Sequence, residues 1–325
     1  MKVVINYQEY PDVEIEKSIL REAFPSVEIV ESRTLDTAEF ITEAEGAQAL
    51  LVAHVAVNKD VIDATPECLG YVRYGAGYDS IDAEYALAQG KIVARVPRFC
   101  IDEVSNHALA MLLALNRKLV SAHQLLVQGN YQFEKIMPVT RLKDSTVGIV
   151  GVGNIGGAFA DRIVPLVKQV LMYDPYVERY PGCQKVNDLR ELCRAADYIS
   201  LHVPLTSQTR KLIDREMLAV MKPTAYLINT SRGPVIDETA LMEALCEWRL
   251  AGAGLDVFET EPLPADSPLR QLDNVVITHH SAWYSEGSVV ELKETVAQQV
   301  VQILEGRRPD YELTETWEQR YRREL

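Results

Sequence analysis

One stretch decides the fold of this chain: Thr146-Val147-Gly148-Ile149-Val150-Gly151-Val152-Gly153-Asn154-Ile155-Gly156-Gly157. Its apolar run enters a glycine-rich turn, so the sequence predicts a buried strand, a tight turn and then a helix. Gly151 permits the turn, Gly153 lets a pyrophosphate approach the backbone, and Gly156 lets the helix pack closely on the strand. The first amides of the helix would bind the anion. The stretch therefore predicts a dinucleotide-binding turn.

The residues that follow supply the rest of the expected unit. Ala158 to Val167 has apolar residues at helical spacing, and Val170 to Tyr173 predicts a second strand that ends in Asp174. Asp174 lies about 18 residues past Gly156, where about 20 is usual, so we expect it to accept the ribose hydroxyls. A carboxylate there repels a 2′-phosphate and favours NAD, while Arg179 nearby leaves the phosphorylated cofactor open. The alternative is a glycine turn in an ordinary βαβ unit with a capping aspartate.

Composition indicates a globular protein. The 325 residues suffice for two domains, and 47% are hydrophobic and 25% charged. A formal net charge of −14 argues against a nucleic-acid partner. No signal peptide is evident and no apolar run reaches the ~20 residues of a membrane helix, so we expect no membrane association. The cysteines show no metal-like spacing and predict reduced thiols in the cytoplasm and no metal. They are Cys68, Cys100, Cys183, Cys193 and Cys246.

Strand-like runs alternate with helical stretches, which predicts parallel sheets with helices on both faces. The first set of runs comprises Val3 to Ile5, Val27 to Val30, Ala49 to Val52, Tyr71 to Tyr74 and Ile92 to Ala94. The second set comprises Val147 to Val150, Val170 to Tyr173, Tyr198 to Leu201, Ala225 to Ile228, Gly254 to Val257 and Val275 to Ile277. Six strands that begin at the glycine turn suit a complete dinucleotide-binding domain.

Two helical stretches mark where the domains join. The stripe of leucines from Asp102 to Gly129 predicts one long helix that bridges two domains, and Ser285 to Gly306 predicts a helix that returns to the first. We therefore predict an α/β protein of two doubly wound parallel-sheet domains, with a Rossmann NAD-binding domain inserted into a flavodoxin-like substrate domain. The predicted ranges are 104–285 for the NAD-binding domain and 1–103 with 286–325 for the substrate domain.

Three polar segments follow strands of the second set, where open α/β sheets bind ligands. Arg232, in Ile228 to Pro234, has a guanidinium that can grip a carboxylate with two hydrogen bonds. Leu255 to Pro262 supplies Glu261, and Val276 to Trp283 supplies two histidines. A carboxylate beside an imidazole keeps the ring charged as a proton donor, which suits carbonyl reduction. Taken singly, the arginine could cap a helix, the glutamate could be a solvated loop acid, and either histidine could be structural.

Together these segments resemble the D-isomer-specific 2-hydroxyacid dehydrogenase family along nearly the whole chain. The ending Ala282 to Ser285 is similar to its C-terminal binding protein-like and phosphoglycerate dehydrogenase-like branch. The matching pieces are Arg73 to Asp82, Gly151 to Gly156, Asn229 to Pro234, Gly254 to Pro262 and Thr278 to Ser285.

The resemblance implies how a substrate would be held. Arg232 would bind its carboxylate and carbonyl, and His280, paired with Glu261, would act as general acid/base while hydride passes to or from the nicotinamide. The loop of Tyr74, Gly75, Ala76 and Gly77 would present backbone amides to the carboxylate, consistent with glycines that permit close approach. Trp283 would form an apolar wall. The alternative for the loop is a tight turn only.

The resemblance also implies which residues hold NAD. Asn154 and Ile155 would contact the pyrophosphate, and Val104 would lie against the nicotinamide. The remaining implied contacts are His202, Val203, Pro204 and Thr209 around the adenosine, and Thr230 and Asp256 near the nicotinamide amide. The alternative for His202 to Pro204 is merely a strand that ends at proline.

The chain departs from the family in places. His279 stands where relatives commonly have proline, and because adjacent side chains of an extended segment point to opposite faces, only one imidazole can meet Glu261. Family register selects His280. Arg98 could read a second anionic group of the substrate, although we favour a surface position for it, and His54 could face the cleft.

We therefore interpret the chain as an NAD-dependent oxidoreductase that interconverts a 2-oxo acid and a D-2-hydroxy acid in a cleft between two domains. The resemblance also suggests a homodimer, with the helix from Val104 at its interface. One alternative is an NAD-responsive, corepressor-like binding protein. Another is a 3-phosphoglycerate dehydrogenase, which would need cations in the first domain, where Lys59, Arg73 and Arg98 are candidates.

Overall fold

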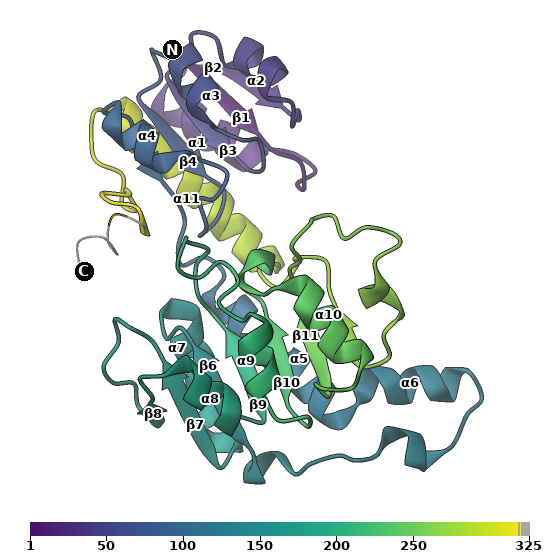
Figure 1. Cartoon of the computed structure of the whole chain (residues 1–325). Coiled ribbons are helices and arrows are strands. Elements are labelled where there is room, and N and C mark those ends of the chain that lie inside the picture. The colour runs from purple at the N-terminus through teal and green to yellow at the C-terminus, as the bar shows by residue number, and fades with distance from the viewer. Residues whose placement is uncertain (318, 320–325) are drawn as a thin grey trace. The chain divides into compact units, whose positions relative to one another are not determined.

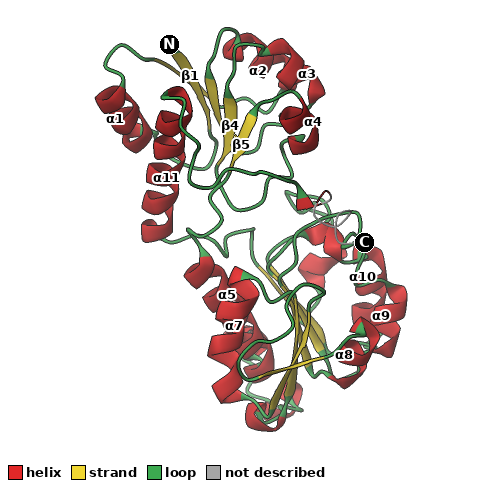
Figure 2. Cartoon of the chain, turned by 90° about the vertical axis from the view of Figure 1, so that its left-hand side faces the viewer, coloured by secondary structure: helices red, strands yellow, loops and turns green. Residues whose placement is uncertain are grey.

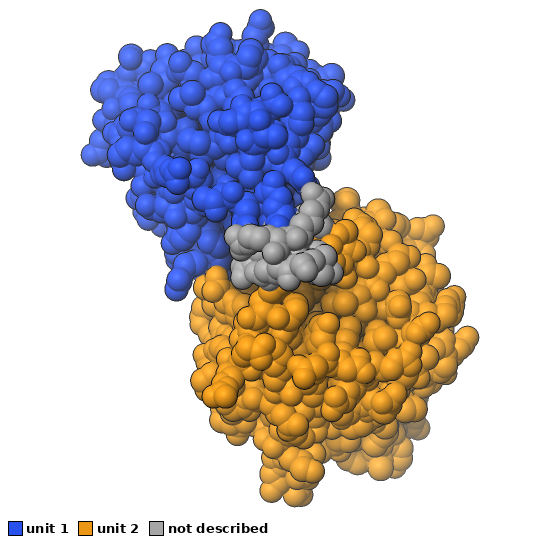
Figure 3. All heavy atoms as spheres, turned by 60° about the vertical axis from the view of Figure 1, so that its left-hand side comes forward, with its two compact units in different colours: residues 1–100, 285–325 blue, residues 101–284 orange. Residues whose placement is uncertain are grey.

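The computed structural model describes residues 1–317 and 319, which form two compact units (Figure 3). The first unit contains residues 1–100 and the described residues from Ser285 onward, and the second contains Ile101–Tyr284. The second unit is thus inserted into the sequence of the first. None of the helices within the described residues combines the length and the hydrophobicity that a membrane span needs.

The first unit contains a parallel five-stranded sheet. Its order, β2-β1-β3-β4-β5, is the flavodoxin-like order 2-1-3-4-5. The strands are β1 Lys2–Asn6, β2 Glu28–Ser32, β3 Ala49–Val52, β4 Gly70–Arg73 and β5 Ile92–Ala94. All five predicted strands of the first set are present.

Helices cover both faces of this sheet, α1 and α11 on one and α2, α3 and α4 on the other (Figure 2). Helix α11 begins where Ser285 and Ser288 form a capping box, so the predicted returning helix is present. The helices are α1 Glu14–Ala23, α2 Thr37–Ala44, α3 Lys59–Ala64, α4 Ala83–Ala88 and α11 Glu286–Leu304.

The second unit contains a parallel seven-stranded sheet in the order β12-β11-β10-β9-β6-β7-β8. Counted from β6, this is the Rossmann order 3-2-1-4-5-6 with one strand added. The sequence missed β8, a three-residue edge strand with no buried residue. The strands are β6 Thr146–Val150, β7 Gln169–Tyr173, β8 Cys183–Lys185, β9 Tyr198–Leu201, β10 Tyr226–Asn229, β11 Gly252–Leu255 and β12 Val275–Ile277.

Helices cover both faces of this sheet too, with α5 and α7 on one and α8, α9 and α10 on the other (Figure 2). Apolar strands buried from both sides are typical of such a sheet. The helices of this unit's two faces are α5 Ile101–Arg117, α7 Asn154–Ile163, α8 Leu189–Ala195, α9 Arg215–Val220 and α10 Glu238–Cys246.

The prediction of one bridging helix from Asp102 to Gly129 is wrong. Lys118 takes a left-handed conformation with φ 52° and separates α5 from α6, Leu119–Val127, and both helices belong to the second unit. The leucine stripe has two environments: Leu112 and Leu115 pack in the core, whereas α6 has no buried residue. Spacing alone does not distinguish these environments.

Candidate active site

The glycine-rich turn joins β6 to α7 as predicted. Gly151 has φ +87°, and a Cβ on Gly156 would lie 2.0 Å from the carbonyl oxygen of Gly151, so both positions require glycine. A Cβ on Gly153 would point into open space, and no side chain caps α7. The amides of Asn154 and Ile155, in its first turn, therefore lack a capping partner and can bind an anion.

Asp174 lies at the end of β7 and is 8% exposed. Its Oδ2 accepts a hydrogen bond from the Val152 amide at 2.7 Å, and its Oδ1 accepts from the amides of Tyr176 and Val177. A carboxylate has about four lone-pair positions, so one remains for a ribose hydroxyl. Asp174 thus also fixes the glycine-rich turn.

The segment after β9 lies against the same turn. Nε2 of His202 is 2.9 Å from the Ser200 hydroxyl, whereas Nδ1 is buried without a partner in the described structure. Burial lowers the pKa of His202 to about 3, so the ring is neutral at pH 7. A Cβ on Gly151 would lie 2.8 Å from the side chain of Val203, and the Thr209 hydroxyl donates to the carbonyl of Pro204 at 2.6 Å. Thr209 therefore shapes this loop with its own hydroxyl.

Thr230, directly after β10, carries a second buried polar atom that lacks a partner within the described chain. Its Oγ1 accepts or donates no hydrogen bond, although the residue is only 9% exposed. Val104 is buried in the first turn of α5. The uncapped helix and the unpaired atoms of His202 and Thr230 fit a bound dinucleotide, because buried polar groups normally have partners.

Arg232 follows β10 in a turn that its neighbours fix. The Asn229 side chain donates to the carbonyl of Arg232 at 2.9 Å and accepts from the amide and hydroxyl of Ser231. A Cβ on Gly233 would lie 1.8 Å from the carbonyl oxygen of Phe258, so the turn packs tightly on the segment after β11. The half-buried guanidinium donates to the Ser231 carbonyl through Nη1 at 2.8 Å.

His280 and Glu261 form a pair. Nδ1 of His280 lies 2.7 Å from Oε2 of Glu261, whose Oε1 accepts from the Phe258 amide at 2.9 Å. Burial alone would raise the pKa of Glu261, but His280, the Phe258 amide and the charge of Arg232 together hold it below its usual value. The carboxylate is therefore charged at neutral pH, and Nε2 of His280 is left for proton transfer.

His279 does not share this pair. It is exposed, whereas its neighbour His280 contacts Glu261. The geometry thus agrees with the family register, which selects His280. Trp283 lies edge-on to Tyr284, with ring centroids 5.7 Å apart.

Asp256 holds the His280 loop. Its carboxylate is 1% exposed and accepts from the Thr278 hydroxyl and from the amides of Ser281 and Ala282, while its carbonyl accepts from the His280 amide. These bonds hold His280 in a left-handed conformation with φ 55°, which is uncommon for a residue other than glycine. We predicted Asp256 beside the nicotinamide amide; these three donors leave one of its about four lone-pair positions.

His107 was missed by the sequence analysis. Its Nε2 lies 3.0 Å from the hydroxyl of Thr278, which in turn donates to Asp256. His107 is in α5, 171 residues before Thr278, and no local motif links them. It extends the network behind the His280 loop.

The predicted substrate loop lies in the first unit, after β4. The amides of Tyr74 and Gly75 donate to the carbonyls of Val52 and Arg73, whereas those of Ala76 and Gly77 donate to no acceptor among the described residues. Two of the four predicted amides are thus free to bind a carboxylate.

The Tyr74 side chain points into the unit instead. Its hydroxyl donates to Oε1 of the fully buried Glu16 at 2.8 Å, and Nζ of Lys293 lies 3.6 Å from Oε2. Burial raises the pKa of Glu16, which Lys293 partly offsets. Tyr74 therefore anchors the loop through its hydroxyl.

Of the other candidate residues in the first unit, Lys59 and His54 have local partners and Arg98 points outward. Lys59 pairs with Asp63, and Nε2 of His54 lies 2.8 Å from Glu9. Arg98 is exposed, in the surface position that we favoured. A Cβ on Gly75 would lie 2.9 Å from the guanidinium of Arg73, which therefore packs under the substrate loop.

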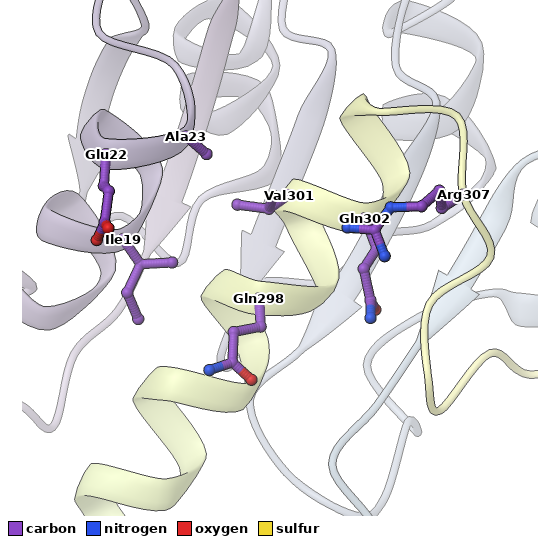
Figure 4. A pocket seen from close by; sticks show the side chains of 7 residues that line it. All are labelled: Ile19, Glu22, Ala23, Gln298, Val301, Gln302 and Arg307. Atoms are coloured by element: carbon purple, nitrogen blue, oxygen red, sulfur yellow. The ribbon is translucent and has the colours of Figure 1, made fainter.

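A surface groove of about 410 Å³ lies between α1 and α11 (Figure 4). Its lining mixes polar and apolar side chains and includes none of the residues above. These side chains are Ile19, Glu22, Ala23, Gln298, Val301, Gln302 and Arg307.

A Rossmann-type unit with a dinucleotide turn, an arginine and a histidine–glutamate pair defines a nicotinamide-dependent oxidoreductase. Residues 109–282 match the family model described as D-isomer specific 2-hydroxyacid dehydrogenase, NAD binding domain. The chain therefore belongs to the D-isomer-specific 2-hydroxyacid dehydrogenase family and carries its NAD-binding domain. The resemblance noted from the sequence is confirmed.

Individual relatives agree with this assignment. The chain is 38% identical over 264 residues to a glyoxylate reductase of Thermofilum pendens, a match that covers 78% of this chain and 77% of the relative. It is 36% identical to a D-3-phosphoglycerate dehydrogenase of Methanocaldococcus jannaschii, covering 82% of this chain but only 52% of the relative. A D-lactate dehydrogenase from Aquifex aeolicus, solved with NAD and lactic acid, has a TM-score of 0.83 and 29% identity, covering 94% of this chain and 96% of that one.

Proposed function

We propose that the protein reduces a small 2-oxo acid to the D-2-hydroxy acid with NADH, and catalyses the reverse oxidation. The observation that carries this proposal is the pair of His280 and Glu261 beside the charge of Arg232. A proton donor and a carboxylate-binding cation are what reduction of a 2-oxo acid requires beyond a hydride.

Each residue has a separate task in the proposed reaction. Arg232 orients the substrate through its carboxylate and polarises the carbonyl, and the amides of Ala76 and Gly77 also bind the carboxylate. His280 donates a proton from Nε2 to the carbonyl oxygen, while Glu261 stabilises the charged ring. When bound, the nicotinamide supplies the hydride to C2 of the substrate. In the reverse direction His280 accepts the proton from the hydroxyl.

The residues that we propose to bind the cofactor lie at one edge of the second sheet. The α7 amides would bind the pyrophosphate, Asp174 the ribose, His202 with its loop the adenosine, and Thr230 the nicotinamide end. The Asp174 carboxylate disfavours a 2′-phosphate, so we expect NADH to bind more tightly than NADPH. Arg179 is exposed near this edge, so both cofactors need to be measured.

Oxidation of NADH in the presence of a panel of 2-oxo acids tests the proposal. The panel contains glyoxylate, hydroxypyruvate, pyruvate, branched and aromatic examples, and phosphohydroxypyruvate. We expect turnover with at least one small member. Preference for phosphohydroxypyruvate would identify a phosphoglycerate dehydrogenase instead, and tight NADH binding without any turnover would favour an NAD-responsive binding protein.

We also propose that the protein is a homodimer. Helix α6 and the segment that follows it extend from the second unit (Figure 1), and several of their large apolar side chains are exposed. Tyr131, for example, is 91% exposed and Phe133 is 67% exposed. Exposed large apolar residues that gather in one segment are typical of an interface. The others are Leu119, Val120, Leu126, Val127 and Met137.

The exposed run gives a testable prediction. Wild-type protein is expected to have about twice the mass of one chain by light scattering, and the double variant Tyr131→Asp with Phe133→Asp should shift to one chain mass, because charges in an apolar interface are costly. Trp248→Asp, an exposed aromatic residue after α10, is the matched control and should stay dimeric. A monomeric wild type would refute the dimer.

The cytoplasm remains our proposed location. All five cysteines are free, and three of them are buried, which suits a reducing compartment.

A further inference from the structure

The free amides of the substrate loop have a definite orientation, because their peptide units are held from the other side. The Gly75 carbonyl accepts from the Val96 amide at 2.9 Å, and the Ala76 carbonyl accepts from Nη1 of Arg95 at 2.9 Å. In a trans peptide the carbonyl and the following N–H point in opposite directions. The amides of Ala76 and Gly77 therefore point away from Arg95 and Val96.

Arg95 is itself held by aromatic rings. Its guanidinium carbon lies 5.7 Å from the ring centroid of Tyr78 and 5.0 Å from that of Trp317, and the two rings stack 6.4 Å apart. The Trp317 amide donates to the Tyr78 hydroxyl at 2.7 Å. Cation–π contacts of this kind fix a guanidinium without a carboxylate partner.

The segment that carries Trp317 is fastened to the edge of the first sheet. Ala94 in β5 forms an antiparallel bridge with Glu312, the Leu313 amide donates to Val93, and the Arg95 amide donates to Tyr311. The C-terminal segment thus adds a short pairing to β5 beside the substrate loop.

Arg95 is partly buried, and burial lowers the pKa of its guanidinium, although arginine stays charged in proteins. No carboxylate of the described residues forms an ion pair with it. Its charge acts on the Ala76 carbonyl. A charged donor on a carbonyl polarises the whole peptide unit and makes its N–H a stronger donor.

We propose that Arg95 is a positioning residue for the substrate carboxylate. It fixes the Ala76–Gly77 peptide so that the Gly77 amide faces the carboxylate, and Tyr78 and Trp317 hold Arg95 in place. This inference rests on the proposed function, in which the loop binds the substrate. It predicts that the C-terminal segment affects substrate affinity without touching the substrate.

Arg95→Met, which keeps the length of the stem but removes the donor and the charge, tests this inference. We expect KM for the preferred 2-oxo acid to rise about 10- to 100-fold, as for loss of a hydrogen bond to a charged group, with kcat within a few-fold of wild type. The affinity of the NADH complex for oxamate, a carboxylate-bearing substrate analogue, should fall by the same factor. NADH affinity should not change.

Further variants distinguish the orienting role of Arg95 from a general effect of positive charge and from a loss of folding. Arg308→Met removes an exposed cation from the same C-terminal segment and should behave as wild type. Arg95→Lys keeps the charge but loses the fork of donors, so it should fall between wild type and Arg95→Met. Trp317→Leu removes a ring over Arg95 and should raise KM more mildly. Circular dichroism of each variant verifies that it folds; if Arg95→Met does not, the Lys and Leu variants carry the test.

An unchanged KM and oxamate affinity in folded Arg95→Met would overturn the inference. The inference would also be overturned if the rise in KM of Arg95→Met vanished at high salt and did not occur in Arg95→Lys. That result would indicate long-range attraction by the charge, which salt screens, and not a direct hydrogen bond, which salt does not screen. If wild-type protein reduced no 2-oxo acid and bound no oxamate, the proposed function would fail, and the inference with it. If wild-type protein reduced a 2-oxo acid and the Arg95 variants had wild-type KM and oxamate affinity, the inference would be refuted while the proposed function would stand.

Discussion

Replacement of His280 by alanine is expected to reduce kcat for 2-oxo acid reduction by about a hundred- to ten-thousand-fold, the range for loss of a general acid. Nδ1 of His280 is paired with Glu261 at 2.7 Å, which leaves Nε2 for the substrate oxygen. NADH affinity should remain within a few-fold of wild type, because the proposed cofactor contacts lie elsewhere. Steady-state rates and NADH fluorescence titration measure the two quantities separately.

His279→Ala is the matched control for this variant. It removes the adjacent imidazole, which is exposed and does not contact Glu261. Its kcat should stay close to that of wild type. If His279→Ala lost activity and His280→Ala kept it, the assignment of the acid would be reversed.

Glu261→Gln should also lower kcat, because the protonated ring would lose its charged partner. The pKa of Glu261 is lowered in the folded protein, so the carboxylate, and the stability that its charge contributes, persist at neutral pH and are lost as the pH falls through that lowered pKa. At pH values above that pKa, where wild-type Glu261 is charged, kcat of Glu261→Gln should therefore be lower than kcat of wild type. Below that pKa the difference between the two proteins should shrink. A pH profile of kcat for both proteins tests this.

Replacement of Arg232 by alanine is expected to lower kcat/KM for the 2-oxo acid by about a hundred- to a thousand-fold, since a charge-assisted bidentate contact is lost from substrate and transition state alike. Oxamate affinity should fall similarly, and NADH affinity should change little. Arg232→Lys should recover only part of the loss, because an ammonium cannot form two parallel hydrogen bonds.

Arg249→Ala is the control for Arg232→Ala. Arg249 lies in the same unit and pairs with Glu247 at the surface, so kcat/KM should not change. Collapse of NADH affinity in Arg232→Ala, with substrate affinity retained, would refute the role assigned to Arg232.

Much of the fold could be predicted because its signals are local. Parallel strands buried on both faces appear as short apolar runs, and every predicted run is a strand. The glycine turn was recognisable because Gly151 and Gly156 meet steric demands that other residues cannot. In contrast, β8 is a short edge strand without an apolar run, and the break at Lys118 depends on where the core ends.

The site was predictable only in part. Arg232, Glu261 and His280 stand in short segments after strands, whereas the network of His107, Thr278 and Asp256 depends on contacts between distant segments. Arg95 gave no signal because its partners are a backbone carbonyl and two aromatic rings, one of them 222 positions away at Trp317. Hydrogen bonds to the backbone leave no pattern in side-chain chemistry.

The most direct test of the central claim is the fate of the hydride. The preferred 2-oxo acid, chosen to give a chiral product, is reduced with NADH that carries deuterium at C4 in the transferred position, and the product is resolved by chiral chromatography with mass detection. We predict a D-2-hydroxy acid with one deuterium at C2. An L product, a product without deuterium, or tight NADH binding with no reduction of any 2-oxo acid would contradict the account.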